Sequence, residues 1–429
     1  MSRETIASIV TPLGEGGIGV IEVSGPRSLE IVNAVFRGKN KRDLRTAESK
    51  SLHYGKIYLN ERIVDEVIIH ILRKKDSFTG EDLVEVNCHG GIQAVKKTLE
   101  CIVFAGAKKV NWQELADRSY LNDKIDLIQK EAYREIPQAK TRLSAKVLLD
   151  QYNGSLSSCL EKLVKRLECE NNINRHMIMY IHDRLKEIGK TAAFGCALTS
   201  PKRVIIAGRP NVGKSTLINS LLRVERTIVH EEPGTTRDAV DILVSIRGIP
   251  FTIVDTAGIR ETEDTVEKLG VAEARNQLRK ADKIVYILDN SNPIENEDRE
   301  LIESIMGISE DYPTHNDAHK NHLIFVINKI DLPQKLDVSL LEIEHSFPLC
   351  RISALESKGL SDLEETLTAE FSDYIQYTPE RAIIFTNRQK KHLSRAFGIS
   401  EDCIRFIQEG KDFLYHVSKI KQELLRCME

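Results

Sequence analysis

The chain contains, from residue 208 onward, the stretch Gly208-Arg-Pro-Asn-Val-Gly-Lys-Ser215. This stretch fits the pattern G-x-x-x-x-G-K-[S/T], and it follows Lys202-Arg-Val-Ile-Ile-Ala207, whose apolar residues are typical of a buried strand. Glycines let backbone amides curl around phosphate oxygens, and a helix predicted to start near Thr216 adds the partial positive charge of its N-terminus. The stretch therefore predicts a phosphate-binding loop in which Lys214 bridges the β- and γ-phosphates and the Ser215 hydroxyl binds Mg²⁺.

Two later segments complete the predicted phosphate and magnesium site. Asp255-Thr-Ala-Gly258 ends an apolar strand, so its aspartate can hold Mg²⁺ directly or through water, and the Gly258 amide can meet the γ-phosphate. Gly234-Thr-Thr-Arg-Asp238 lies between this segment and the phosphate-binding loop, and Thr236 is the natural second hydroxyl on Mg²⁺. We interpret 234–238 as a switch ordered by the γ-phosphate. An ion pair is a commoner role for its Arg237 than an arginine finger.

The base is identified by Asn328-Lys-Ile-Asp331, which follows another apolar strand. A carboxylate accepts two hydrogen bonds from the N1–H and the exocyclic amine of guanine, and adenine cannot offer that pair. Alone, the same four residues could equally be a helix cap. With the other motifs in order, they predict GTP rather than ATP, and Ser353-Ala-Leu supplies a backbone amide to the guanine O6.

The predicted site lacks one familiar group. Ile259 follows Gly258 where many GTPases carry a glutamine that orients the attacking water. Because isoleucine cannot hydrogen-bond water, another residue must orient it or hydrolysis will be slow. The residues predicted to contact the nucleotide are Asn211, Val212, Gly213, Lys214, Ser215, Thr216, Thr235, Thr236, Asp255, Gly258, Asn328, Lys329, Asp331, Ser353 and Ala354.

The rest of the chain indicates a multidomain protein of mixed α/β and α+β class. Its 429 residues suggest about three domains. Short β-like runs between glycines predict an α+β domain over 1–118. Apolar residues from Leu149 to Leu167, at three- and four-residue steps, predict one amphipathic helix. We expect the helices of 119–200 and 373–429 to pack together as one discontinuous domain. A Ras-like G domain over 201–372, with helices on both faces of its sheet, is inserted between them.

Charge, cysteines and hydropathy exclude several classes of protein. The formal net charge is −3, so any contact with nucleic acid must come from a local basic patch. Eight scattered cysteines without metal-like spacing indicate reduced thiols in a cytoplasmic protein. There is no signal-peptide pattern and no apolar run of about 18 residues, so no membrane association is expected. The His- and Asn-rich segment 315–322 is interpreted as a surface loop.

These motifs, with a hydrophobic residue in place of the glutamine, resemble those of the tRNA modification GTPase family MnmE, also called TrmE. The similarity covers most of the chain. The segments that carry it are 5–20, 77–82, 89–91, 120–127, 208–215, 233–238, 255–260, 266–270 and 386–389.

The resemblance implies a mechanism that does not need the glutamine. In the family, G domains dimerise across their nucleotide faces, and a K⁺ ion stands in for an arginine finger. Glu267 matches the glutamate that orients water in the family, whereas without the resemblance it would be taken for a solvated helix residue. The K⁺ ligands implied in this chain are Asn211, His230, Glu232 and Thr235.

The resemblance also implies a cofactor and partners. The family binds a formyl- or methylene-tetrahydrofolate in an N-terminal domain that dimerises. With the flavoprotein MnmG it modifies the wobble uridine of certain tRNAs. The folate contacts implied here are Glu81, Arg118, Asn122 and Lys124.

Two departures from the family pattern keep alternatives open. Glu22 stands where the family usually carries arginine, and the chain ends at Cys427-Met-Glu, without the family's Cys-x-Gly-Lys. A lone thiol near a helix end is more often inert than reactive. One alternative is a regulatory GTPase that has lost the modification chemistry. The other is a ribosome-assembly GTPase that uses its helices to bind RNA.

Overall fold

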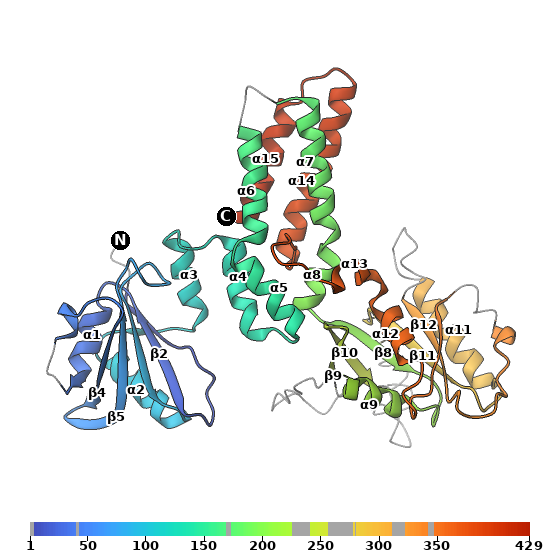
Figure 1. The fold of residues 1–429 in the computed structure, drawn as a ribbon, viewed down its shortest axis with the longest axis horizontal. Helices are drawn as coiled ribbons and strands as arrows, with labels where there is room; N and C mark the ends of the chain where they lie inside the picture. The colour runs from blue at the N-terminus through green and yellow to red at the C-terminus, as the bar shows by residue number, and fades with distance from the viewer. Residues whose placement is uncertain are drawn as a thin grey trace. The chain divides into compact units, whose positions relative to one another are not determined.

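The structure is a computed structural model that describes residues 4–39, 43–168, 173–224, 241–255, 278, 280–310, 322–341 and 347–429. By its internal contacts the chain divides into two compact units. The first comprises Met1–Pro137, Tyr152–Ser157 and Leu425–Glu429, and the second comprises Gln138–Gln151 and Ser158–Leu424 (Figure 1). The division into three domains stays a prediction. No helix in the described ranges combines the length and apolarity that a membrane crossing needs.

The first unit contains a seven-stranded sheet in the order β3-β4-β5-β6-β2-β1-β7. Its strands are β1 (Ile6–Ile9), β2 (Ile18–Ser24), β3 (Phe36–Gly38), β4 (Ser51–Leu59), β5 (Arg62–Leu72), β6 (Leu83–His89) and β7 (Lys108–Lys109). Its helices are α1 (Ser28–Val35), η1 (Leu44–Thr46), α2 (Ile92–Phe104), α3 (Gln113–Leu121) and α4 (Leu127–Glu135), followed by η2 (Ile136–Gln138). The predicted α+β character of this region is confirmed.

Side chains alternate along these strands, so one face is apolar and covered. Val84, Val86 and Cys88 of β6 are buried, and they share a core with Val95 and Leu99 of α2. The intervening residues Glu85, Asn87 and His89 lie on the opposite face, as the period of two requires. That second face also exposes large apolar side chains on neighbouring strands, namely Leu52, Tyr54 and Ile68.

The second unit contains a six-stranded sheet in the order β13-β12-β11-β8-β10-β9. Its strands are β8 (Lys202–Ala207), β9 (Asp241–Ile246), β10 (Ile249–Asp255), β11 (Lys283–Asp289), β12 (Leu323–Asn328) and β13 (Leu349–Arg351), and all neighbouring pairs are parallel except β9 with β10. The helices are α9 (Lys214–Val224), α11 (Asn296–Glu310), η6 (Val338–Leu341), α12 (Leu360–Thr368), η7 (Ala369–Phe371) and α13 (Ser372–Ile375).

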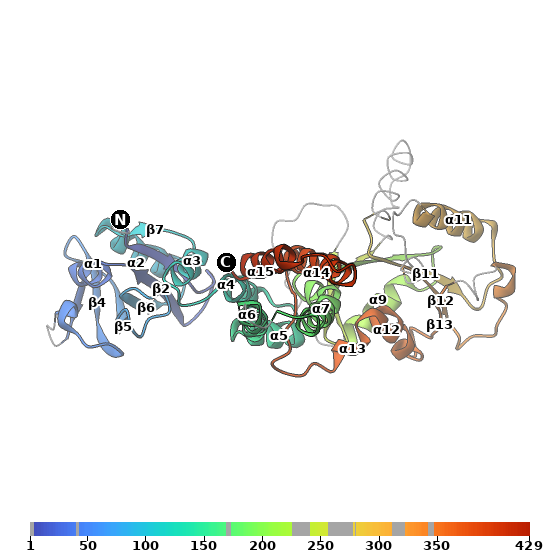
Figure 2. The ribbon, with the colours of Figure 1, turned by 90° about the horizontal axis from the view of Figure 1, so that it is seen from above.

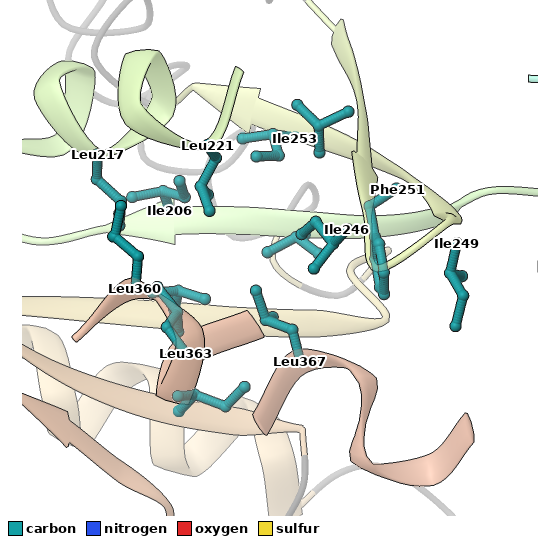
Figure 3. Close-up of a cluster of buried hydrophobic side chains, with 14 of the residues drawn as sticks. Ile206, Leu217, Leu221, Ile246, Ile249, Phe251, Ile253, Leu360, Leu363 and Leu367 are labelled. Atoms are coloured by element: carbon teal, nitrogen blue, oxygen red, sulfur yellow. The ribbon is translucent and has the colours of Figure 1, made fainter. Parts of the chain in front are cut away.

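Helices cover both faces of this sheet, as predicted. On one face, Leu217 and Leu221 of α9 and Leu360 of α12 pack with sheet residues such as Ile206 and Phe251 (Figure 3). On the other face, the buried side chains of α11 pack against β11 and β12. The central strand β8 therefore carries the phosphate-binding loop from the middle of a well-covered sheet.

The predicted helices form an antiparallel arrangement of long segments. They are α5 (Arg142–Tyr152), α6 (Ser155–Glu168), α7 (Arg175–Lys190), α8 (Ala192–Thr199), α14 (Asn387–Gln408) and α15 (Leu414–Met428). α7 packs along α14, and the Lys421 ammonium of α15 lies 3.0 Å from the Glu168 carboxylate of α6 (Figures 1 and 2). Helices from these two parts of the chain therefore contact each other, and their grouping into one domain stays a prediction.

One part of the helical prediction is wrong. Leu149 is 50% exposed, although its spacing to Leu156 predicted one continuous apolar stripe. Gly154 has a positive φ of 95° and separates α5 from α6, so the two helices do not share one helical phase. The stripe begins only at Leu156, which is fully buried.

Candidate nucleotide-binding site

The loop after β8 has a backbone that requires its glycines. Gly208 and Gly213 have positive φ angles of 145° and 101°. A Cβ atom on Gly208 would lie 2.6 Å from the Ile287 carbonyl oxygen, and one on Gly213 would lie 2.3 Å from the Asn328 side-chain nitrogen. The loop therefore curls tightly against the neighbouring strands, with its backbone close enough to cradle a phosphate.

Helix α9 begins at Lys214, two residues before the predicted start near Thr216. The left-handed Gly213 lets the chain turn directly into the helix, so Lys214, Ser215 and Thr216 all belong to its first turn. The amides at this helix end have no partners within the helix, which makes the end an anion site. Ser215 and Thr216 are exposed there.

The Lys214 ammonium is held over the loop by two backbone carbonyls. Its Nζ donates to the Gly208 oxygen at 2.9 Å and to the Arg209 oxygen at 2.7 Å. These bonds keep a positive charge at the mouth of the loop, where the β- and γ-phosphates of a nucleotide are expected.

Asn328 joins three loops at the carboxyl edge of the sheet. Its side-chain nitrogen donates to the Val212 oxygen at 2.8 Å, and its side-chain oxygen accepts from the Ala354 amide at 3.0 Å. The Ser220 hydroxyl of α9 also donates to the Ala354 oxygen, at 2.7 Å. The predicted base-binding segments are thus brought together with the phosphate-binding loop.

Lys329 makes a second connection to that loop. Its Nζ donates to the Asn211 oxygen and to the Asp289 carboxylate, both at 2.7 Å. Lys329 has a φ of 63°, an uncommon conformation for a residue other than glycine, and such conformations concentrate at functional sites. Both contacts fix the lysine stem beside the place where a guanine ring is expected.

Sequence reasoning missed Asp289. It ends β11, is almost fully buried, and pairs in register with Asn328 of β12. Burial alone raises the pKa of Asp289, but hydrogen bonds from Lys329 and Ser291 outweigh this effect and lower that pKa below its ordinary value. A polar residue directly after an apolar strand, at the carboxyl edge of a parallel sheet, was the available signal.

The remaining described members of the predicted base site are close by. Asp331 is exposed two residues beyond Lys329, so its carboxylate can accept from a bound base. Ser353 and Lys358 exchange backbone hydrogen bonds, and the Ser353 hydroxyl accepts from the Glu356 amide at 3.1 Å. These bonds shape the turn that presents the Ala354 region to the site.

Several predicted site residues cannot be placed. They lie outside the described residues and are His230, Glu232, Thr235, Thr236, Gly258 and Glu267, together with Arg237 and Ile259. Asp255 is described through its backbone only: it ends β10, with Ile206 of β8 as its neighbour in register. A serine hydroxyl at the start of α9 and an aspartate at the end of the adjacent strand are suitable ligands for Mg²⁺.

Comparison with known proteins places this site in a family. The family description "GTP-binding protein TrmE N-terminus" matches residues 5–124, and "50S ribosome-binding GTPase" matches residues 203–329. The tRNA modification GTPase MnmE of Bacillus subtilis is 33% identical over 99% of this chain and 94% of its own. This chain belongs to the MnmE family. The MnmE of Clostridioides difficile is 34% identical, covering 96% and 91%, and that of Carboxydothermus hydrogenoformans is 38% identical, covering 92% and 88%.

Family membership settles the class of the nucleotide site. The second unit carries a P-loop GTPase domain, and hydrogen bonds of Lys214, Asn328 and Lys329 connect the loop after β8 to the segments around 328 and 354. The match of 5–124 to the description "GTP-binding protein TrmE N-terminus", and the similarity over nearly the whole chain, do not favour the alternative of a regulatory or ribosome-assembly GTPase that has lost the modification chemistry.

The residues implied as folate contacts of an MnmE protein already have hydrogen-bond partners within this chain. The Arg118 guanidinium donates to Glu81 at 3.1 Å and to the Glu4 backbone oxygen at 2.9 Å, and its side chain is only 10% exposed. The Asn122 side chain donates to the Thr79 oxygen at 2.7 Å. These groups tie the 77–82 segment to α3, so their polar atoms serve the fold of the first unit.

The charge nearby is also unfavourable for folate. Glu22 lies opposite Glu85 on adjacent strands, and burial, with the Glu85 charge as a second cause, raises the pKa of Glu22 to about 7. Lys124 donates to the Lys75 backbone oxygen at 3.4 Å. A folate brings carboxylates of its own, and two adjacent carboxyl groups repel them. The residues present do not fit a folate carboxylate, and we derive no step through that cofactor.

Proposed function

We propose that this chain hydrolyses GTP at the carboxyl edge of its six-stranded sheet and does so as part of tRNA modification. The observation that carries the proposal is the hydrogen bonding of Asn328 to both Val212 and Ala354. These bonds support a single site in which the phosphate loop and the base-reading Asp331 act on one molecule. Guanine, which offers two donors to a carboxylate, is the base that such a site selects.

Hydrolysis transfers the γ-phosphoryl group to water. The water oxygen forms a bond to the γ-phosphorus while the bond from that phosphorus to the β–γ bridging oxygen breaks, and GDP leaves with the electron pair. The Lys214 ammonium, held by the loop carbonyls, offsets the negative charge that grows on the bridging oxygen. Ser215 and Thr236, and Asp255 directly or through water, would hold Mg²⁺, which would supply further positive charge at the phosphates.

Potassium ion is the proposed substitute for an arginine finger. Asn211 fits this role because its side chain is exposed on the phosphate-binding loop, where the Asn211 φ of 64° turns the backbone. The other proposed ligands are His230, Glu232 and Thr235. Glu267 is the proposed residue that orients the attacking water, since Ile259 cannot do so.

The potassium proposal predicts a difference between monovalent cations. GTP turnover should be at least about tenfold faster in K⁺ than in Na⁺ at equal ionic strength, because the smaller ion does not satisfy the same ligands. Glu267→Ala should slow single-turnover hydrolysis about 10²-fold in K⁺, with Glu303→Ala on the exposed side of α11 as the matched control. Equal rates in the two salts, or a Glu267→Ala variant as fast as its control, would contradict this mechanism.

We propose the partners that the family implies: a second copy of this chain, tRNA, and a flavoprotein of the MnmG type. The exposed apolar side chains of Leu52, Tyr54 and Ile68, on the same face of the first sheet as Glu85 and Asn87, support pairing of the N-terminal parts. The proposed compartment is the cytoplasm, where tRNA is modified. A mass of one chain in solution with GTP and K⁺ would contradict the pairing.

The role in tRNA modification predicts a chemical change in cells. Cells that lack the chain should lose a modified nucleoside at the wobble position of a subset of tRNAs, and the chain should restore it. The Lys214→Ala variant should not restore it, because the modification depends on GTP hydrolysis. The measurement is mass spectrometry of nucleosides from purified tRNA, and identical nucleosides with and without the chain would refute the role and favour a regulatory GTPase.

A further inference from the structure

The second residue of the phosphate-binding loop points away from the nucleotide site. The Arg209 guanidinium lies 2.6 Å from the Glu295 carboxylate and 2.8 Å from the Asp298 carboxylate, and its side chain is only 13% exposed. Burial by itself lowers the pKa of Arg209, but the hydrogen bond to Glu295 and the charge of Asp298 outweigh it and raise that pKa. The arginine is therefore a fixed positive charge between the loop and the start of α11.

The burial of Asp298 makes its pairing with a positive charge important for stability. Its side chain is 2% exposed, and it accepts from the Tyr286 hydroxyl and from the Glu295 amide, both at 3.2 Å. A buried carboxylate is costly unless it is paired with a positive charge and hydrogen-bonded. The tyrosine and the amide supply hydrogen bonds, and Arg209 supplies the positive charge. Tyr286 is buried in β11, so its hydroxyl ties the Asp298 carboxylate to the sheet.

The backbone carbonyl of Arg209 also binds the Lys214 side chain. Its carbonyl oxygen accepts from the Lys214 ammonium at 2.7 Å, next to the Gly208 oxygen at 2.9 Å. The residue whose side chain is clamped to α11 is thus the residue whose carbonyl holds the lysine. Fixing the guanidinium limits how far the peptide group can rotate, and so fixes the direction of that carbonyl.

We propose that Arg209 is a positioning residue for GTP hydrolysis: its clamp on Glu295 and Asp298 sets the carbonyl that holds Lys214 against the phosphates. This inference rests on the proposed GTP hydrolysis and deepens it. Without the contacts of Arg209 to Glu295 and Asp298, the Lys214 ammonium is held less firmly and can be displaced from the phosphates. A small displacement of a charge at the reacting centre costs up to about 10²-fold in rate.

The test must separate positioning from stability. Arg209→Met removes the guanidinium but leaves Asp298 buried without its positive charge, so the variant is expected to unfold at lower urea concentration. The double variant Arg209→Met with Asp298→Asn removes both charges and keeps an acceptor for Tyr286, so its urea midpoint should return close to that of the unaltered chain. Single-turnover hydrolysis and GTP affinity are then measured for each variant.

The proposal predicts that the double variant stays slow although it is stable again. Its hydrolysis should be about 10- to 100-fold slower than that of the unaltered chain, and its GTP affinity about tenfold weaker. A matched control is Lys283→Met with Glu370→Gln, an ion pair at the opposite end of β11 in which Lys283 is buried and the two side chains lie 3.3 Å apart. That control should hydrolyse GTP at the unaltered rate.

Two results are distinguished by this design. In the double variant, the hydrolysis rate and the GTP affinity could recover together with the urea midpoint. This result would overturn the proposal, because Arg209 would then be a purely structural residue. An unaltered chain that binds GTP without hydrolysing it would refute the proposed function. The affinity ratio between the double variant and the unaltered chain would still decide the role of the clamp.

Discussion

Replacing Asp331 with asparagine is expected to weaken GTP binding by about 10³-fold and to make xanthosine triphosphate the preferred nucleotide. The carboxylate accepts from the N1–H and the amine of guanine, whereas the asparagine amide turns one acceptor into a donor. Xanthine carries a carbonyl in place of that amine and keeps its N1–H, so it complements the amide. In the variant an amide donor faces the guanine amine, and this mismatch of two donors accounts for the size of the effect.

Competition with a fluorescent guanine nucleotide measures this change directly. Asp337→Asn is the matched control, because Asp337 is exposed six residues further along and its carboxylate accepts from the Ser339 hydroxyl. The control should bind GTP as the unaltered chain does. A variant at Asp331 that still prefers GTP to xanthosine triphosphate would show that another group reads the base.

Lys214→Ala is expected to slow hydrolysis by about 10³-fold and also to weaken GTP binding. The ammonium contacts the phosphates in the ground state and offsets more charge as the bridging oxygen becomes negative, so the rate falls further than the affinity. The measurement is single-turnover release of phosphate at saturating GTP. Lys190→Ala is the control, since Lys190 lies on α7 and pairs with Glu187. Hydrolysis that survives in Lys214→Ala would place the positive charge elsewhere.

The position of the phosphate-binding loop between a strand and a helix could be predicted from the sequence, because its motif depends on backbone shape at a strand end. The glycines of 208–213, the lysine that follows them and the Asn328 segment needed only strand, loop and helix in order. The structure adds the bonds from Asn328 to Val212 and Ala354. It also shows that α9 starts two residues earlier than predicted, because Gly213 turns the chain into the helix without a spacer.

The partners of buried charges could not be predicted in the same way. Asp289 and Asp298 both lie in the chain between the phosphate loop and the base-reading segment, and neither belongs to a motif. Their significance depends on β11 lying between β8 and β12 and on α11 starting beside the loop, which are tertiary facts. Arg209 was part of the quoted motif, but the motif does not reveal where its side chain points.

The periodicity of apolar residues also gave a wrong prediction where a glycine separates two helices. The spacing from Leu149 to Leu167 suggested one helix, yet Gly154 divides it and leaves Leu149 at the surface. In the first unit, the resemblance implied folate contacts at Arg118 and Glu81, and the structure pairs these two side chains with each other. Spacing and resemblance identify candidate site residues. Only the folded structure shows which of their polar atoms already hydrogen-bond within the protein.

The most direct test of the account is competition between GTP and ATP for the unaltered chain in Mg²⁺, followed by the same titration with the Asp331→Asn variant. The account predicts that GTP displaces the fluorescent guanine nucleotide at a concentration at least about 10²-fold lower than ATP does. It also predicts that this preference disappears when Asp331 is replaced. Equal displacement by ATP and GTP, or a preference that persists in the variant, would contradict it.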